Sequence, residues 1–332
     1  MSIRGLRAAH PRRVIGQETI VFGLAIALFA GFALLLDGFA APANLLNILR
    51  SVAVLGILAA GMGIVVIGRG IDLSMVSVMV VTVAVQLQLM QSGWGLWPAS
   101  AVVALMAIAI GAANGAMVAY AGVPALFATL ASGAFVFGFV RSQILSQDVV
   151  YIPENATGLL SLGTARVFGL PVDVLVFLAV VLILIGLLRW SRPGRFLYLM
   201  GDNFNAARTM GIPVRPLIVA AFTLAALLAW LAGLASAISL QSMNTRLVNS
   251  ALLYDVVLVV VIGGIGLSGG KGGTRNVVVG AMLIGVLLNG MTILNLPNIQ
   301  QNLIKALILL GAIILDGQLN PRDEQTSQQG DI

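Results

Sequence analysis

The stretch VIGGIGLSGGKGG, residues 261–273, decides how the rest of the chain is interpreted. Residues 264–269 match the G-x-G-x-x-G pattern of dinucleotide-binding loops, and residues 270–271 resemble the end of a P-loop. A P-loop, however, needs glycine at the position of Ile265 and serine or threonine at the position of Gly272. The first glycine and the hydroxyl that binds magnesium are both missing, so a P-loop is rejected.

A dinucleotide-binding interpretation of the same glycines also fails. It requires an amphipathic helix after the loop and an acidic residue about 20 positions further on. The chain instead continues with another apolar segment, and no Asp or Glu occurs between Asp255 and Asp316. Glycine also lets helices approach closely and lets a chain break inside a membrane. We therefore expect Gly264, Gly269 and Gly270 to serve helix packing or a helix break rather than phosphate binding.

The composition indicates a protein that crosses a membrane several times. Hydrophobic residues make up 59% of the 332 residues and charged residues only 9%, against roughly a quarter in soluble domains. There is no cysteine, and the only histidine is His10 in a basic tail. Disulfides, thiolate metal sites and histidine catalysis in the core are therefore excluded, and no metal site is expected. The net charge of +6 is interpreted as membrane topology rather than nucleic-acid binding.

Apolar segments long enough to span a lipid bilayer, about 20 residues each, follow one another along the chain. Ten are predicted, at 18–36, 48–68, 73–91, 97–120, 124–145, 171–189, 216–240, 252–267, 277–295 and 300–316. The stretch 68–74 is either a loop or a break inside a span, and 252–267 is short. The predicted domains are a basic tail at 1–17, a transmembrane domain at 18–316 and a polar tail at 317–332.

The distribution of Lys and Arg predicts the orientation, because cytoplasmic segments carry an excess of these residues. With the N-terminus inside, the outer segments hold only five of the 18 basic residues, namely Arg50, Arg141, Arg166, Arg246 and Lys305. The most basic loop, around 190–215, then lies on the inner side. We therefore expect an even number of spans and both termini in the cytoplasm.

Two pairs of similar stretches indicate an internal repeat. VVIGRGIDLS (65–74) is similar to VVIGGIGLSGG (260–270), and IGAANGAM (110–117) is similar to IGVLLNGM (284–291). The copies are an odd number of predicted spans apart, so they run in opposite directions. An inverted repeat of this kind is typical of transporters, although spans rich in Gly, Val and Ile also resemble one another by chance.

The basic loop GRFLYLMGDNFNAARTMGIPVRP (194–216) contains a short amphipathic helix that stops at a glycine. It resembles the cytoplasmic coupling loop of ABC importer permeases, in which a pair of alanines precedes a glycine by a few residues. The resemblance implies that small side chains let this helix, within about 193–215, enter a cleft on an ATPase subunit. It assigns ATPase coupling to Asn203, Ala206, Ala207, Arg208, Gly211 and Arg195. An ordinary helix lying on the membrane surface is the alternative.

Four further stretches resemble the monosaccharide branch of those permeases, typified by the ribose permease. They are GIDLS (70–74), GVPALFATLASG (122–133), GIGLSGGKGG (264–273) and IGVLLNGM (284–291), in the order of the family. Val76, Ser142 and Asn276 depart from the common pattern. These departures place the exact sugar in doubt, but not the class.

The resemblance implies an all-α polytopic fold in a bacterial inner membrane, multi-pass with both termini cytoplasmic. It implies a second permease copy, identical or related, and cytoplasmic ABC ATPase subunits that carry the ATP and magnesium. It also implies a periplasmic sugar-binding protein, and no cofactor, nucleic acid or enzymatic activity for this chain. The expected function is ATP-driven import of a monosaccharide or related polyol.

A neutral polyol needs hydrogen-bonding groups along its path but no counter-charge. The candidate path residues are Arg69, Asp72, Ser74, Asn114, Thr129 and Asn289. Asp72, with Arg69 three positions before it, is either a gate on the path or a local pair or cap at a helix break. Asn114 and Asn289 either line the path or hold helices together.

Three other functions compete with ATP-driven import. An ion-coupled secondary transporter of a small polar solute also uses inverted repeats and broken helices, but it needs several membrane acids, and only Asp72 is an evident candidate. A membrane-embedded enzyme needs a nucleophile, a metal site or paired carboxylates, none of which the spans offer. A passive channel gives no reason for the coupling loop.

Overall fold

The computed structural model describes residues 17–319, and the predictions for the two tails lie largely outside these residues. Among the described residues, seven helices are long and apolar enough to cross a membrane. They are α1 (Gln17–Leu35), α2 (Pro42–Ile67), α4 (Leu96–Ala119), α5 (Ala125–Gln143), α7 (Val172–Ile185) continued by the π-helical turn η1 (Gly186–Trp190), α10 (Val214–Leu240) and α12 (Thr274–Ile293). Three further apolar helices accompany them, α3 (Met75–Gln91), α11 (Leu252–Gly263) and α13 (Asn298–Leu319), the last with an apolar part at Asn298–Ile314.

Each of the ten predicted segments coincides with one of these helices, so the positions of the apolar elements are confirmed. The number of membrane crossings stays a prediction. With 12 residues, α11 is about 18 Å long, well short of the roughly 30 Å of a bilayer core. The predicted segment 252–267 is therefore a half-length helix followed by a glycine loop, because the chain turns at Gly264 with a φ of 93°.

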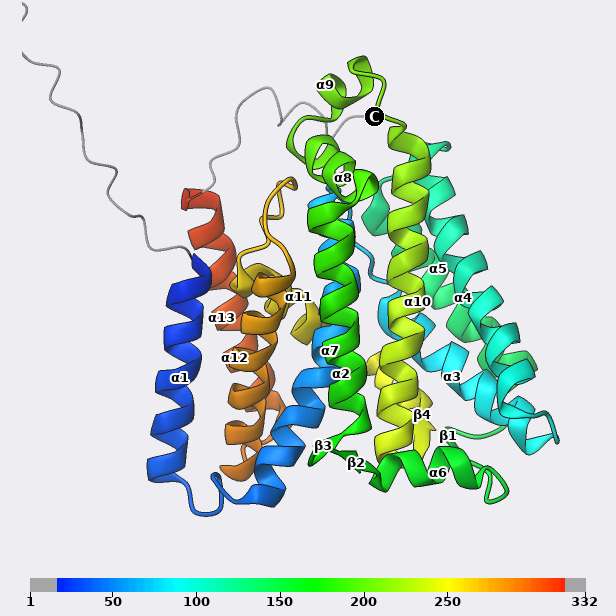
Figure 1. Ribbon diagram of the computed structural model, residues 1–332, viewed down its shortest axis with the longest axis vertical. Helices are drawn as coiled ribbons and strands as arrows, with labels where there is room; N and C mark the ends of the chain where they lie inside the picture. The colour runs from blue at the N-terminus through cyan, green and yellow to red at the C-terminus, as the bar shows by residue number, and fades with distance from the viewer. Residues whose placement is uncertain (1–16, 320–332) are drawn as a thin grey trace, which may run out of the picture.

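The chain is not purely helical between its spans. Two short antiparallel ribbons pair β1 (Val149–Tyr151) with β4 (Ser242–Asn244), and β2 (Arg166–Val167) with β3 (Leu170–Pro171). They lie with α6 (Thr157–Thr164) at one end of the helix bundle, and the 3-10 turn η2 (Thr245–Asn249) follows β4. The helices α8 (Arg192–Asp202) and α9 (Phe204–Thr209) lie at the opposite end (Figure 1). We name these ends the α6 end and the α9 end.

Helix α2 lies at the centre of the bundle, because most of its apolar residues are buried by other helices. It packs against α7, α10, α11 and α12, while α10 also packs against α3 and α4. Glycines in α2 allow this packing. A Cβ on Gly61 would lie 3.3 Å from the backbone of Ala225 in α10. Close contact between backbones is the usual way in which helices associate inside a membrane.

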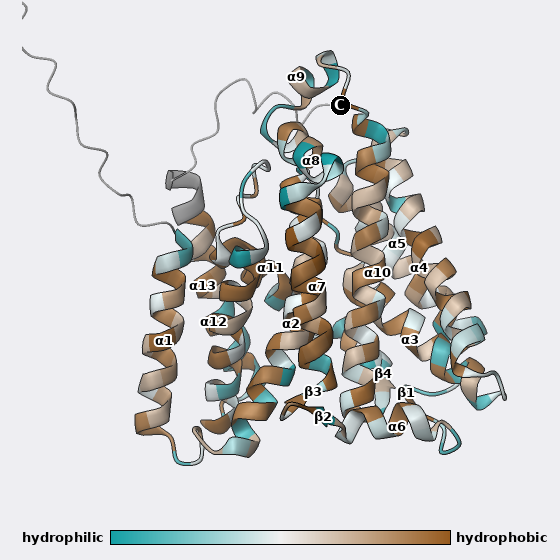
Figure 2. Cartoon of the chain, viewed as in Figure 1, coloured by the Kyte–Doolittle hydropathy of each residue, from teal (hydrophilic) through white to brown (hydrophobic). Residues whose placement is uncertain are grey.

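The flanks of the bundle are apolar, as Figure 2 shows by the brown residues between the two ends. Large exposed hydrophobic side chains gather on the peripheral helices; examples are Leu24 on α1, Leu105 on α4, Phe127 and Phe135 on α5, and Leu307 on α13. A soluble protein rarely exposes so large an apolar surface. The structure therefore agrees with the membrane location that the composition predicts.

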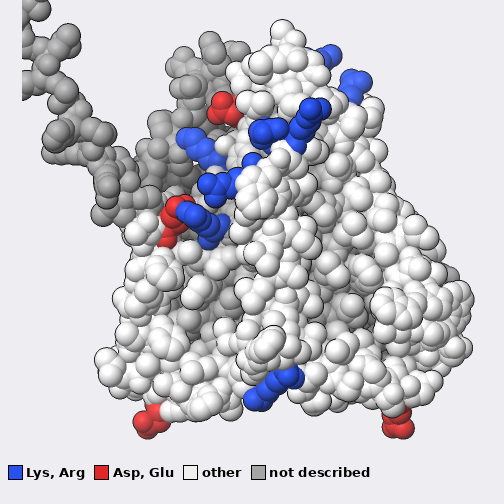
Figure 3. Space-filling view, in the orientation of Figure 1, with Lys and Arg blue, Asp and Glu red and all other residues white. Residues whose placement is uncertain are grey.

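Charge is concentrated at the α9 end. On the face shown in Figure 3, Lys and Arg gather mainly over that end of the bundle. The exposed basic residues there are Arg189, Arg192, Arg195, Arg208, Arg215, Lys271 and Arg275. Under the positive-inside rule this is the end expected to face the cytoplasm.

Candidate functional site

The first candidate site is a buried polar cluster at the break between α2 and α3. Helix α2 ends at Ile67 and α3 begins at Met75, so the helix is interrupted at 68–74, where the sequence predicted either a loop or a break inside a span. Asp72 is 1% exposed, and its Oδ1 accepts hydrogen bonds from the N–H of Ser74 (2.9 Å) and from the Ser74 hydroxyl. The side-chain amide of Asn114 in α4 donates to the Ser74 hydroxyl oxygen at 2.9 Å. These three residues therefore join the break to α4.

Helix α5 completes the cluster. The Thr129 hydroxyl oxygen accepts a hydrogen bond from the N–H of Leu73 at 3.0 Å, and the hydroxyl donates to the Ala125 carbonyl in its own helix. A Cβ on Gly133, one turn further along, would lie 3.1 Å from the Ser74 Cα. Four of the six predicted path residues, Asp72, Ser74, Asn114 and Thr129, are thus in one buried cluster.

Arg69 does not belong to this cluster, so of the alternatives given for Asp72 the structure does not show the local pair with Arg69. Its Nε donates to the carbonyl of Gly201 at 2.6 Å, and its Nη2 donates to the carbonyl of Asp202, both at the end of α8. Arg69 has a φ of 68°, in the left-handed region that few residues other than glycine adopt. This backbone conformation turns the side chain away from Asp72 and toward the α9 end.

The Arg69 contacts are part of a junction between three chain segments far apart in sequence. The N–H of Gly270 in the glycine loop donates to the carbonyl of Ile67, the last residue of α2, at 2.9 Å. A Cβ on Gly201 would collide with the Ile67 carbonyl oxygen and with Gly270 N, and one on Gly269 would collide with the Arg69 side chain. We call Ile67, Arg69, Gly201, Gly269 and Gly270 the break junction. At Gly201, Gly269 and Gly270 the neighbouring chain segments lie too close for a Cβ.

The short helix predicted in the basic loop is present as α9, directly after Gly201 of the junction, and its coupling role stays a prediction. Asn203 caps its first turn, since Asn203 Oδ1 accepts from the N–H of Ala206 at 2.9 Å. Gly211 follows with a φ of 78° and open space where a Cβ would stand. The two alanines of the predicted pair differ in exposure: Ala206 is exposed, whereas Ala207 is fully buried against the rest of the permease. Arg195 and Arg208 are both exposed at this end.

Asn289 lies apart from the other predicted path residues. It exchanges two side-chain hydrogen bonds with Asn44 of α2, each 2.9 Å long, and the Asn44 amide also donates to the Phe39 carbonyl. The structure thus gives Asn289 the helix-joining role, between α12 and the start of α2. The sequence had left this alternative open.

Asn276, which departs from the family pattern, makes a buried hydrogen bond to the end of α11. Its side-chain amide donates to the carbonyl of Gly263, the last residue of α11, at 2.7 Å. A Cβ on Gly264 would lie 3.2 Å from the same Asn276 nitrogen. Asn276 therefore satisfies a carbonyl that the helix end leaves free, which a glycine at this position could not do.

Two ion pairs, each with a buried aspartate, were not predicted from the sequence. Asp255 of α11 pairs with Lys305 of α13 at 2.8 Å. Asp173 of α7 lies 3.9 Å from Arg50 of α2, which also donates to Ser239 and to the Gly163 carbonyl. Each pair joins two helices, and the pattern of apolar residues does not predict that these helices are in contact. A lone charge inside an apolar segment was the available signal, because such charges are usually paired.

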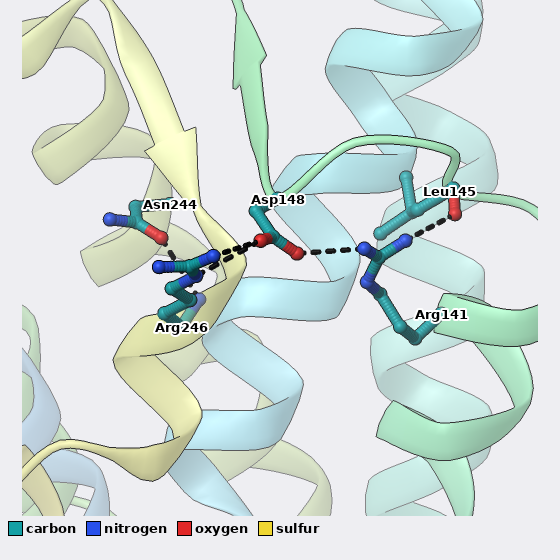
Figure 4. Close-up of polar contacts among 5 residues, drawn as sticks. All are labelled: Arg141, Leu145, Asp148, Asn244 and Arg246. Carbon is teal, nitrogen blue, oxygen red and sulfur yellow. Dashed lines mark hydrogen bonds and ion pairs between the residues drawn. The ribbon is translucent and has the colours of Figure 1, made fainter.

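A further group of charged residues lies at the α6 end (Figure 4). Asp148 accepts from Arg141 at the end of α5 and from Arg246 of η2, with ion-pair distances of 2.7 Å on both sides. Arg141 also donates to the Leu145 carbonyl. The hydrogen bonds from Arg246 and Arg141 hold the pKa of the Asp148 carboxyl below its usual value. This group connects the loop before β1 to the turn after β4.

A cavity of about 680 Å³ opens between the α2–α3 break, α9 and the start of α10. Arg69, Gly70, Arg208, Arg215 and Ser268 are among the residues that line it. The cavity therefore borders both the break junction and α9. Among the described residues there is no group of three or more His, Cys, Asp or Glu side chains that could hold a metal ion.

An apolar helix bundle, a buried polar cluster at the end of its central helix and an exposed basic end are together typical of a polytopic membrane transport protein. Comparison with known proteins gives the family. The chain belongs to the family described as branched-chain amino acid transport system / permease component, whose model matches residues 44–313.

Curated relatives resemble the chain over nearly its whole length. It is 32% identical to the ribose import permease protein RbsC of Haemophilus influenzae over 298 residues, covering 90% of this chain and 92% of that protein. It is 33% identical to RbsC of Escherichia coli K12, covering 83% and 86%, and 31% identical to the L-arabinose transport system permease protein AraH of the same strain, covering 87% of each. No solved structure matches the chain.

These relatives confirm the resemblance to sugar importer permeases that the motifs suggested. The chain is a multi-pass permease component and not an enzyme.

Proposed function

We propose that the chain is the permease subunit of an ATP-driven ABC importer that carries a monosaccharide or related polyol from a periplasmic binding protein into the cytoplasm. The named activities of the relatives, ribose and L-arabinose transport, support a pentose-sized neutral substrate. The observation that carries the proposal is the break junction. It joins the end of α8, directly before the coupling helix, to the chain break beside the buried polar cluster.

The chemistry of the polar cluster suits a neutral polyol. Ser74, Asn114 and Thr129 present hydroxyl and amide groups, which can exchange hydrogen bonds with sugar hydroxyls. In this proposal the cluster lies at the gate of the path, and the 680 Å³ cavity beside the junction is the exit toward the cytoplasm. Asn289 is assigned to helix packing and not to the path.

The coupling of ATP hydrolysis to transport is assigned to α9. Ala206 and Gly211 are exposed and small, so α9 can enter a cleft on a cytoplasmic ATPase, while Arg195 and Arg208 pair with acidic residues there. ATP and magnesium are held by that partner. A displacement of α9 reaches α2 and the glycine loop through Arg69, Gly201 and Gly270. Two permease copies, identical or related, then rock against each other.

The same proposal fixes the orientation. The basic α9 end faces the cytoplasm, as do both termini, and the α6 end with the Asp148 group faces the binding protein. The breaks after α2 and α11 correspond to the two halves of the inverted repeat. The ion-coupled alternative is less well supported, because two of the three buried aspartates among the described residues, Asp173 and Asp255, lie close to cations.

The test is capture of the tagged permease from its native membranes in mild detergent, followed by mass spectrometry. Wild type is expected to bring down an ATP-hydrolysing subunit, and Gly211→Arg is expected to lose it. Gly169→Arg is the matched control, because Gly169 has a φ of 79° and equally open space but lies at the α6 end. A wild-type permease that comes down alone and carries sugar in liposomes without ATP would overturn the proposal.

A further inference from the structure

A shallow groove of about 600 Å³ runs along the surface where α4 and α10 cross. The two backbones are in close contact there, since a Cβ on Gly115 would lie 2.5 Å from the Val219 Cα. Ala112 and Ala116 of α4 and Val219 and Leu227 of α10 line the groove. Because the side chains beside this close helix crossing are small, they leave a surface groove that no other helix of the described chain fills.

The groove is chemically suited to a hydrocarbon chain. Between its two ends the groove carries one hydroxyl, that of Thr223, which donates to the Val219 carbonyl of its own helix at 2.8 Å and so is not free to donate to a ligand. From Pro216 to Leu227 the groove follows α10 for about 16 Å, at 1.5 Å per residue. This length matches one leaflet of a bilayer, whose whole hydrocarbon core is roughly 30 Å thick.

The end of the groove toward α9 is polar and positively charged. Tyr120, 59% exposed, lines this end, and the Arg215 guanidinium lies over its ring, 5.5 Å from the centroid. Within residues 17–319, Arg215 makes no hydrogen bond or ion pair that would neutralise its charge. Tyr120 and Arg215 also line the adjoining 680 Å³ cavity, which offers room for a polar headgroup.

We propose that the α4–α10 groove binds an anionic phospholipid of the cytoplasmic leaflet, with an acyl chain along Ala112, Ala116 and Val219 and the phosphate at Arg215. The placement in the cytoplasmic leaflet rests on the orientation given under the proposed function. Arginine binds phosphate through paired, charge-assisted hydrogen bonds, and tyrosine is favoured at the membrane interface. Basic pockets between helices on the cytoplasmic side are suited to such headgroups.

The site lies next to the coupling machinery. Arg215 is the second residue of α10, and only Ile212, Pro213 and Val214 separate it from Gly211. A bound headgroup would therefore stabilise the start of α10 against the end of α4, close to where α9 moves. The lipid would act as a structural ligand of the helix through which the ATPase is coupled.

The experiment is native mass spectrometry of the purified permease, delipidated and re-equilibrated with phosphatidylglycerol or phosphatidylcholine. Wild type is expected to retain phosphatidylglycerol preferentially. Arg215→Gln should reduce that preference roughly fivefold, the effect of one basic residue near a membrane surface. Arg166→Gln, at the α6 end, is the matched control and should leave it unchanged. Excess inorganic phosphate should not displace a ligand that is also held by its acyl chain.

A second pair of variants tests the groove itself. Ala116→Phe should fill it and abolish retention of the lipid, whereas Ala113→Phe, on the exposed surface of α4 outside the groove, should not. Equal retention of both lipids by wild type, or retention unchanged in Arg215→Gln, would overturn the proposal. So would Ala116→Phe dissociating a permease dimer, because a second copy would then be the occupant. Lipid retention without ATP-driven uptake would refute the proposed function and leave the lipid site standing.

Discussion

The N–H of Gly270 donates to the carbonyl of Ile67 at 2.9 Å, although the two residues lie in chain breaks some 200 positions apart. Ile67 ends α2, and its carbonyl would otherwise be one of the free acceptors at a helix C-terminus. The bond therefore satisfies the end of the central helix with the loop that the glycine motif forms. Arg69 also donates hydrogen bonds to the end of α8. The end of α2, the glycine loop and the end of α8 are therefore in direct contact, and a displacement of one would disturb its contacts with the other two.

Arg69→Ala is expected to uncouple ATP hydrolysis from transport. The substitution removes the donors to Gly201 and Asp202 but no part of α9, so the ATPase should still bind. Arg69→Lys should rescue little, because a single ammonium cannot reproduce the planar guanidinium that reaches two carbonyls. The measurement is sugar uptake per ATP hydrolysed in proteoliposomes. Unchanged uptake per ATP in Arg69→Ala would remove Arg69 from the coupling mechanism.

Ala206 is exposed and Ala207 is buried, so replacing each of them with tryptophan should cause a different defect. Ala206→Trp should leave the permease as stable as wild type but block capture of the ATPase, because Ala206 is exposed on α9. Ala207→Trp should lower the melting temperature of the permease itself, because Ala207 is fully buried, and overpacking costs about 1–3 kcal/mol. Thermal unfolding in detergent and ATPase capture separate the two. Equal effects of both substitutions on both measurements would contradict the geometry.

Ser74→Ala is expected to damage the buried polar cluster. It removes the hydroxyl that donates to Asp72 and accepts from Asn114, and each buried group left without a partner costs about 1–3 kcal/mol. Uptake should fall by at least tenfold while ATPase binding is retained. Thr82→Val is the control, because the Thr82 hydroxyl is buried in α3 and donates only to carbonyls of its own helix. Loss of uptake in both variants alike would indicate a general packing defect.

The apolar runs and glycines predict where the helices lie and where they break, because both follow from the local sequence. The partners of the polar side chains could not be predicted in the same way. Arg69 was expected near Asp72, three positions away, but a left-handed backbone turns it toward α8. Asn289 and Asn44 meet only because α12 packs on α2, and Asp255 finds Lys305 only because α11 packs on α13. Such pairs depend on tertiary packing, which spans of similar composition do not specify.

The Asp148 group predicts a pH dependence at the α6 end. Hydrogen bonds from Arg246 and Arg141 lower the pKa of Asp148 from its ordinary 3.8, so its contribution to stability is present above that value. The contribution is lost as the pH falls through the lower pKa of the folded state. The melting temperature of wild type should therefore exceed that of Asp148→Asn by a constant amount from about pH 7 to about pH 5. The difference should shrink only below about pH 4, and a difference that vanishes already near pH 6 would contradict the direction of the shift.

The buried pair of Asp255 and Lys305 predicts a strong asymmetry between single and double substitutions. Lys305→Met leaves the Asp255 carboxylate buried between α11 and α13 without its cation, which typically costs about 3–5 kcal/mol. Lys305→Met combined with Asp255→Leu removes both charges and should recover most of the lost stability, because two apolar side chains avoid the desolvation penalty. The measurement is the melting temperature and yield of each purified variant. If the double variant also regains sugar uptake, the pair serves only to hold α13 on α11. If it regains stability but not uptake, the charges themselves take part in transport, and the ion-coupled alternative would have to be tested at this pair.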